Sequence, residues 1–376
     1  MREKTSPTTS RNRLESALGT LLVPFLAVLT AVVVGGIIIA IVGGDPFKAY
    51  FGLIEGAFGS PKALSETAVW ATPYIFAGLA VAVAFKGGLF NIGAEGQLAF
   101  GAVTAALIGY ALPGWLGINL PAFIHIPLAV GLGMLAGAIW AAIPGALKAY
   151  TGGHEVINTI MMNYIALNIT AYLLNGPMRD PDPLNLSART PEIAISARIP
   201  PIFNNPLLRV HWGFVLALLV AVIIWWLLWK TTLGFEIRTV GSNPDSAKYA
   251  GINVKRTIII TMALSGALAG LAGAIEVTAL NYRHELGFST GYGFDAIAIA
   301  LLGKTNPYGV ILAAILFGAM RNGATRMQFL TQIPVDIISV IQALILLFVA
   351  ADAIIRFVYR IRTREERVVL TRGWGG

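Results

Sequence analysis

Residues 87–101 read Gly-Gly-Leu-Phe-Asn-Ile-Gly-Ala-Glu-Gly-Gln-Leu-Ala-Phe-Gly and interrupt an apolar run of membrane length. Asn91, Glu95 and Gln97 would each cost free energy in hydrocarbon, up to about 2.5 to 3.5 kcal/mol for an acid at mid-depth, so they should face protein or water. Gly93 and Gly96 make the backbone there breakable, and a broken backbone at membrane depth survives only inside a bundle or beside a cavity. The stretch therefore predicts an all-α polytopic membrane protein with a buried pathway.

The composition of the whole chain agrees with a membrane protein. Of its 376 residues, 56% are hydrophobic and 12% are charged, whereas a soluble domain has about 25% charged residues. The chain contains no cysteine, which excludes disulfides, thiolate metal sites and cysteine nucleophiles. Its four histidines stand far apart in the sequence, without the short spacing of a metal motif, so we expect no metal site.

The net charge of +8 raises the question of a nucleic acid partner. The basic residues, however, gather in loops and tails that flank apolar spans, not on one amphipathic face. With the N-terminus inside, most of the 27 lysines and arginines fall on the cytoplasmic side. This excess favours an N-in, C-in orientation, and we expect no nucleic acid partner.

The apolar runs predict about ten membrane segments. Eight of them could cross about 30 Å of hydrocarbon: 18–42, 64–85, 90–112, 124–147, 156–174, 211–229, 257–280 and 335–357. Two more, 289–302 and 308–320, reach only about 20 Å and predict either short tilted spans or a re-entrant pair broken at Asn306-Pro307. Small residues at four-residue spacing within 265–274 predict close helix packing.

The remaining segments complete the expected organisation. A cytoplasmic tail (1–17) precedes the transmembrane domain (18–357), and a basic cytoplasmic tail (358–376) follows it. The outer loop, 175–210, is rich in proline and mixes both charges, which favours an ordered extracytoplasmic cap or docking surface, with a simple connector as the alternative.

The inner loop, 230–256, contains the pattern of a very short capped helix. Asn243 is a typical N-cap, Pro244 fits the first helical position, and Asp245 suits the positive end of the helix dipole. Gly251 can take the left-handed conformation that ends a helix. So short a helix is unstable alone, so it needs a surface to pack on; an ordinary helical turn is the alternative. The small and aromatic residues that it offers are Ala247, Tyr249 and Ala250.

Three separated motifs carry a resemblance to a known family. They are residues 87–101, the stretch Gly153-His-Glu-Val-Ile-Asn-Thr-Ile-Met-Met-Asn-Tyr-Ile-Ala166, and Thr232-Leu-Gly-Phe-Glu-Ile-Arg-Thr-Val-Gly-Ser-Asn-Pro continuing to Tyr249-Ala-Gly-Ile252. Together they resemble the permease subunit of an ABC importer, from the family that serves sugars, branched-chain amino acids and nucleosides. The nearest likeness is to its nucleoside branch, which depends on a lipoprotein, and it covers residues 18–357.

The resemblance implies a transport subunit and not an enzyme. Such a permease lies in the prokaryotic cell membrane as a multi-pass protein, pairs with a second permease that is a paralogue, and receives nucleosides from an extracytoplasmic binding lipoprotein. ATP and Mg²⁺ belong to a partner ATPase, and this chain carries no cofactor. The residues expected to couple the inner loop to that ATPase are Gly241, Asn243, Pro244, Asp245, Ala247, Tyr249, Ala250 and Gly251.

One stretch imitates a nucleotide site. Residues 298–305 end in Gly-Lys-Thr like a phosphate-binding loop, but the first glycine of that motif is Ala298 here. The stretch also closes a hydrophobic segment, and Pro307 follows where the helix of such a loop should begin. We therefore expect any nucleotide site to lie in the partner.

Polar side chains at membrane depth are the candidates for the substrate path. We place Asn91, Glu95 and Gln97 first, and Asn158, Asn163 and Tyr164 second, because amide and phenol groups can hydrogen-bond a neutral polar ligand. Trp70 and Tyr74 could stack on a nucleobase, and Glu276 and Asp295 could line the entrance. The alternative for the first six residues is interhelical hydrogen bonding, worth about 0.6 kcal/mol per contact, and for the aromatic residues it is packing. For Glu276 and Asp295 the alternative is a salt bridge to Arg283 or Arg321.

The residues alone are also compatible with other functions. A passive channel or ion-driven carrier could use residues 91–97 as its filter, and uptake by this chain alone would distinguish it from an importer. Within the importers, a simple sugar such as ribose is the second candidate ligand. A membrane-embedded enzyme lacks a readable catalytic set.

Overall fold

The computed structural model describes residues 9–182, 187–289 and 291–350, and these ranges are mostly helical. In chain order the helices are α1 (Thr9–Ile41), α2 (Pro46–Phe58), α3 (Pro61–Lys86), α4 (Ala94–Gly114), α5 (Ala122–Thr151), α6 (Glu155–Asn175), η1 (Ile195–Ala197), α7 (Trp212–Lys230), α8 (Thr232–Ser242), α9 (Pro244–Tyr249), α10 (Val254–Glu276), η2 (Val277–Asn281), α11 (Tyr292–Leu302), α12 (Pro307–Thr331) and α13 (Asp336–Ala350). Outside the helices, the described ranges contain only two isolated β-bridges. The all-α class is therefore confirmed, while the basic tail 358–376 lies outside the described residues.

Within the described residues, six helices are long and apolar enough to cross a membrane: α3, α4, α5, α6, α7, and α10 continued through η2. Shorter apolar helices cover 25–41, 292–302 and 336–349. The prediction was wrong at the start of α4, which begins at Ala94 and not at Phe90. The chain before it is not helical, because Gly88 takes a φ of +70° directly after α3 ends. The polar motif is therefore a break between two helices rather than part of one span.

The region 289–320 contains a half-length helix followed by a full-length one. α11 has 11 residues, about 16 Å, whereas the 25 residues of α12 reach about 37 Å. The apolar pattern ended α12 too early because polar residues follow Met320. These residues bind neighbouring helices: Asn322 Nδ2 donates to the carbonyl of Gly56 at 3.0 Å, and Arg326 pairs with Glu55 at 3.0 Å.

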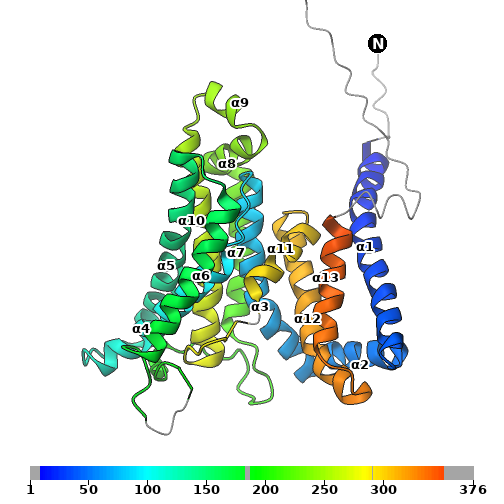
Figure 1. Ribbon diagram of the computed structural model, residues 1–376, viewed down its shortest axis with the longest axis horizontal. Helices are drawn as coiled ribbons and strands as arrows, with labels where there is room; N and C mark the ends of the chain where they lie inside the picture. Colours follow the sequence, from blue (N-terminus) through cyan, green and yellow to red (C-terminus); the bar gives the residue numbers. More distant parts are fainter. Residues whose placement is uncertain (1–8, 183–186, 290, 351–376) are drawn as a thin grey trace, which may run out of the picture.

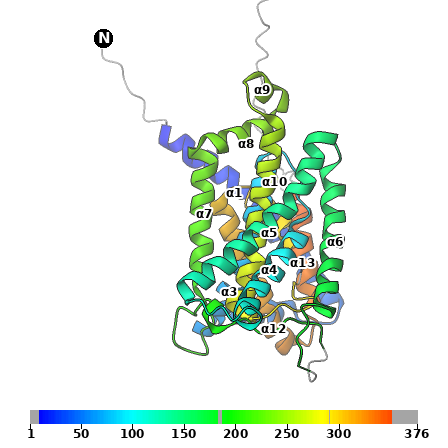
Figure 2. The ribbon, with the colours of Figure 1, turned by 90° about the vertical axis from the view of Figure 1, so that its left-hand side faces the viewer.

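The helices define two ends of the molecule. One end carries α8 and α9, the start of α1 and the last turn of α13 (Figure 1). The other carries α2 and the loop between α6 and α7, and Figure 2 shows the same separation from the side. We call them the α9 end and the cap end. The described chain thus begins and finishes toward the end that carries the 230–256 loop, and the orientation of that end in the membrane stays a prediction.

Helix α10 forms the centre of the bundle and packs along α3, α4 and α5. Its small residues allow this approach: a Cβ added at Gly270 would lie 2.7 Å from the Gly133 carbonyl oxygen and 3.0 Å from the Cα of Gly137. A Cβ at Gly273 would overlap the carbonyl oxygen of Leu98 on α4. The close packing predicted from the small-residue spacing of 265–274 is therefore confirmed.

Candidate functional site

The first turns of α4 and α11 lie against each other. Glu95 Oε2 on α4 accepts a hydrogen bond from the backbone N–H of Gly293 on α11, at 2.7 Å. A Cβ at Gly293 would lie 2.6 Å from the Cα of Glu95, so only glycine permits this contact. The carboxylate satisfies one of the amides that a helix start leaves free and suits the positive end of the α11 dipole. Glu95 is thereby buried between two broken segments.

An aromatic and polar cluster joins α11 to α3. Tyr74 is fully buried and donates its hydroxyl to Asp295 Oδ2 at 2.8 Å. The ring of Tyr292 meets Tyr74 edge-on at 5.1 Å and Trp70 at 6.3 Å between centroids. The Arg321 guanidinium lies 5.8 Å from the Trp70 ring. Tyr292 contacts both Trp70 and Tyr74, and it directly precedes Gly293, which binds Glu95. The structure thus places these two aromatic residues close to Glu95.

Asn91 and Gln97 form a reciprocal amide pair. Asn91 Nδ2 donates to Gln97 Oε1, and Gln97 Nε2 donates to Asn91 Oδ1, both at 2.9 Å. Asn91 Nδ2 also donates to Ser265 Oγ on α10 at 2.8 Å, and that hydroxyl donates to the Ala80 carbonyl on α3 at 2.7 Å. Both amides are 1% exposed. In this conformation they hold α4, α10 and α3 together, so a substrate could reach them only if the pair opened.

The second candidate set is spread over different faces of α6. Asn163 is buried, and its side-chain amide makes two hydrogen bonds to the segment around residues 91–97. Its Oδ1 accepts from the Gly96 N–H at 2.8 Å, and its Nδ2 donates to the Ile92 carbonyl at 2.9 Å. Asn158 is half-buried. Tyr164 is 61% exposed on the outer surface of the chain. The structure therefore joins Asn163 to the first set and leaves Tyr164 apart, and a substrate contact at any of these residues stays a prediction.

The structure pairs the break at Gly93, before α4, with a second break at Gly291, before α11. Gly88 and Gly287 both have left-handed φ angles, +70° and +73°. Gly93 and Gly291 then cap α4 and α11, and each helix carries an acid in its first turn. The α3–α4 link leaves the α9 end and the α10–α11 link leaves the cap end, which makes an inverted pair of the kind that transporters build around their pathways. The glycine and acid spacing of 287–295 was the signal that could have revealed it.

The loop between α7 and α10 folds as its sequence predicts. Asn243 Oδ1 accepts from the N–H groups of Asp245 and Ser246, at 2.9 and 3.0 Å, and Pro244 begins α9. Gly251 has a φ of +83°. Ala247, expected to face a partner, is instead 0% exposed, so it packs within this chain. Tyr249 is 97% exposed and projects from the α9 end.

Helix α8 rests on the link between α3 and α4. A Cβ at Gly88 would lie 2.9 Å from the Cα of Gly241, and a Cβ at Gly241 would overlap the carbonyl oxygen of Lys86. The backbones are therefore in direct contact. A displacement of α8 must move the chain that leads into residues 91–97.

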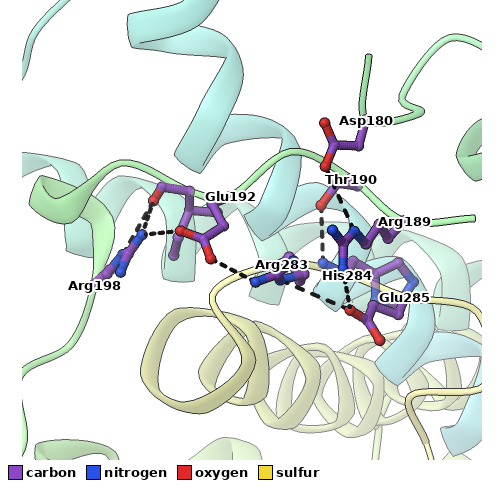
Figure 3. Close-up of polar contacts among 9 residues, drawn as sticks. Asp180, Arg189, Thr190, Glu192, Arg198, Arg283, His284 and Glu285 are labelled. Carbon is purple, nitrogen blue, oxygen red and sulfur yellow. Dashed lines mark hydrogen bonds and ion pairs between the residues drawn. The ribbon is translucent and has the colours of Figure 1, made fainter. Parts of the chain in front are cut away.

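At the cap end, the proline-rich loop is fastened to the α10–α11 connection (Figure 3). The backbone N–H of Thr190 donates a hydrogen bond to the carbonyl of His284 at 2.9 Å. Glu192 pairs with Arg283 at 2.6 Å and with Arg198 at 2.9 Å. Residues 187–202 and 282–289, which we call the cap, therefore form an ordered structure and not a loose connector.

His284 is the buried residue of the cap. It is 1% exposed, and neither of its ring nitrogens has a hydrogen-bond partner among the residues that the structure describes. Burial lowers the pKa of His284 to about 3. Its ring packs edge-on against Phe288 at 4.4 Å. No group of three His, Asp or Glu in the described part of the chain is arranged to hold a metal ion.

Comparisons with known proteins agree with this arrangement. Residues 63–350 match the family described as branched-chain amino acid transport system, permease component. The guanosine ABC transporter permease NupP of Bacillus subtilis is 43% identical over 91% of this chain and 96% of its own length. The glucose ABC transporter permease TsgB13 of Haloferax volcanii is 35% identical over 86% of each chain. A second Bacillus subtilis guanosine permease, NupQ, is 30% identical over 67% of this chain and 78% of its own. No solved structure matches.

Proposed function

This chain belongs to the family of branched-chain amino acid transport system permease components, and from that premise we propose that it is the permease subunit of an ABC importer for nucleosides. It lies in the cell membrane as a multi-pass protein. The observation that carries the substrate class is its 43% identity with a guanosine permease over almost the full length of both chains.

The inverted half-helices supply the pathway. The starts of α4 and α11 meet at Glu95 and Gly293, and the residues around them on α3 and α6 complete one wall of the translocation path. Its proposed members are Asn91, Glu95, Gln97, Asn158, Asn163, Tyr164, Trp70 and Tyr74. In an importer the binding protein can supply the affinity for the substrate, so weak contacts along this wall suffice. A site that bound the substrate tightly would slow its release.

The two ends of the molecule fit two different partners. We assign the α9 end to the cytoplasm and to an ABC ATPase, which binds ATP and Mg²⁺, with Tyr249 as the exposed anchor. The cap end, with its ordered ion pairs, receives an extracytoplasmic binding lipoprotein. A second permease completes the path, and the existence of two related guanosine permeases in Bacillus subtilis supports a paralogue in that place.

A simple sugar is the second candidate substrate, favoured by the 35% identity with the glucose permease of Haloferax volcanii. Glucose and nucleosides share hydroxylated rings, so the fold alone does not separate them. Both offer hydroxyl donors, but only a nucleoside adds a base with N–H donors and a flat aromatic face. The choice therefore rests on which relatives are more similar.

Uptake by the reconstituted importer tests the function. The permease, its paralogue, the ATPase and the binding protein are placed in liposomes, and the uptake of labelled guanosine, ribose and glucose is measured with and without ATP. We expect ATP-dependent guanosine uptake, which is lost with an ATPase variant that binds but does not hydrolyse ATP. Uptake of a sugar without nucleoside would favour the second candidate, and uptake by this chain alone would establish a passive channel.

A further inference from the structure

A cavity of about 250 Å³ lies beside the aromatic cluster, near the cap end. It is enclosed by the first half of α3, the end of α10 with its π-turn, and the start of α11. The lining residues that matter are Trp70, Arg209, Glu276, Asn281, Phe288 and Tyr292. Three aromatic rings and a few polar groups make the composition typical of a small-molecule site.

Glu276 is a buried acid with unused hydrogen-bonding capacity. Its side chain is 6% exposed, and within the described residues its carboxylate accepts a single hydrogen bond, from Asn281 Nδ2 at 3.5 Å. A carboxylate can accept about four hydrogen bonds, and a buried polar group without them is costly. The acid therefore has room for donors that a ligand would bring.

Arg209 acts on Glu276 through the space of the cavity but makes no direct ion pair with it in the described part of the chain. Arg209 lines the same cavity, but its guanidinium is bound to Glu66 through two hydrogen bonds, at 2.7 and 2.5 Å. This pairing holds the pKa of Arg209 above its usual range. Arg209 therefore stays engaged at the rim, and no ion pair to Glu276 occurs within the described ranges.

We propose that this cavity is the first substrate site of the permease, in which Glu276 accepts two hydrogen bonds from adjacent N–H or O–H donors on a ring ligand that packs against Trp70. Purine nucleosides offer such donor pairs in two places. Guanine presents N1–H and the 2-amino group side by side, and ribose presents its 2′ and 3′ hydroxyls. A base also supplies a flat face for stacking on the aromatic rings.

The site rests on the proposed nucleoside function and adds a selectivity to it. A polar group placed to bind a donor discriminates strongly against an analogue that lacks the donor, because the group is then left unpaired. Inosine keeps the ribose diol and N1–H but lacks the 2-amino group of guanosine, so its base has no donor pair. A 2′,3′-dideoxyguanosine keeps the base and lacks the diol. The two analogues therefore separate the two sources of donors.

The test compares Glu276→Gln with wild type in the complete reconstituted importer. The binding protein is the same in both, so any change in substrate preference belongs to the permease. If Glu276 binds the base, the variant lowers guanosine uptake by about tenfold, because the Gln side chain has no second oxygen to accept from the 2-amino group. Inosine uptake stays within about twofold, because the remaining oxygen still accepts from N1–H. If it reads the diol, guanosine and inosine fall alike and dideoxyguanosine does not change.

Two further variants control for folding. Glu55→Gln removes a carboxylate of α2 that pairs with Arg326 away from the cavity, and it should leave all three uptake rates unchanged. Trp70→Leu should lower all three, because each ligand carries a purine, while ATP hydrolysis stimulated by the binding protein persists. Unchanged preference in Glu276→Gln, or an equal fall of all three rates together with loss of that ATPase stimulation, would overturn the proposal. A wild-type importer that takes up no nucleoside refutes the proposed function instead.

Discussion

Gly241 at the end of α8 lies in backbone contact with Gly88, the residue that turns the chain out of α3 toward the polar motif. A Cβ at Gly88 would come within 2.9 Å of the Gly241 Cα. This contact joins the exposed α9 end to the segment that contains Asn91 and Gln97. If the ATPase docks at the α9 end, as proposed, a movement of α8 would pass to the interior of the bundle through direct backbone contact.

Replacing Gly241 with alanine should weaken the coupling between ATP hydrolysis and uptake. The added methyl would overlap the carbonyl oxygen of Lys86 and lie 2.7 Å from the carbonyl carbon of Gly87, so α8 must move away from the α3–α4 link. We expect ATP hydrolysis to persist while the nucleoside imported per ATP falls several-fold. The matched control is Gly131→Ala on α5, where an added Cβ meets nothing within 4 Å. Equal coupling in the two variants would contradict the assignment.

Tyr249→Ala should weaken binding of the ATPase without changing the fold of the permease. The side chain is 97% exposed, so its removal leaves no cavity, and an exposed aromatic at the tip of a docking helix is a typical binding hot spot. We expect affinity for the ATPase to fall by about thirtyfold, which corresponds to about 2 kcal/mol. Phe123→Ala, which removes a 77% exposed aromatic from α5 next to the cap end, should not alter that affinity, measured by co-purification or titration in detergent.

The amide pair should show strong energetic coupling between Asn91 and Gln97. Changing either residue to alanine leaves the other amide buried without its partner, at a cost of about 1–3 kcal/mol. Removing both should cost less than the sum of the single changes by about 0.5–3 kcal/mol. The measurement is a double-mutant cycle on thermal or denaturant unfolding of the purified permease. Asn322→Ala, whose partners lie on α2 and α3, should add independently, and additive effects for Asn91 and Gln97 would show that the pair is not a unit.

Local signals predicted the short helix of the inner loop almost completely. Asn243, Pro244 and Gly251 occupy the cap, first and terminating positions expected of them, because capping depends on residues only a few positions apart. The apolar runs likewise located the six long apolar helices of the described residues, apart from the start of α4, since hydropathy requires no knowledge of neighbours. Ala247 was misjudged because its burial depends on how α9 packs, which its own sequence does not contain.

Long-range contacts could not be predicted in the same way. Glu95 and Gly293 are 198 positions apart, and the sequence around either residue does not identify the other as its contact. The length of α12 was also missed, because Arg326 and Asn322 look like the end of an apolar run until Glu55 and the Gly56 carbonyl are placed beside them. Polar residues near a membrane helix end are therefore ambiguous until their partners are known.

The cap should lose stability as the pH falls, because His284 is buried in its neutral form. Its pKa is lowered to about 3 in the folded protein, below an ordinary value of about 6.5. Between these two pKa values the unfolded chain binds a proton at this ring and the folded cap does not. The free energy of unfolding therefore falls as the pH falls, by at most about 1.4 kcal/mol per pH unit for one group.

Replacing His284 with leucine removes the titrating ring, so the melting temperature should depend less on pH between about 7.5 and 5. This range stays above the titration of ordinary carboxylates. His154→Leu, at an exposed position, should keep the slope of the wild type. A slope in His284→Leu equal to that of the wild type would show that protonation of this ring does not control the stability of the cap.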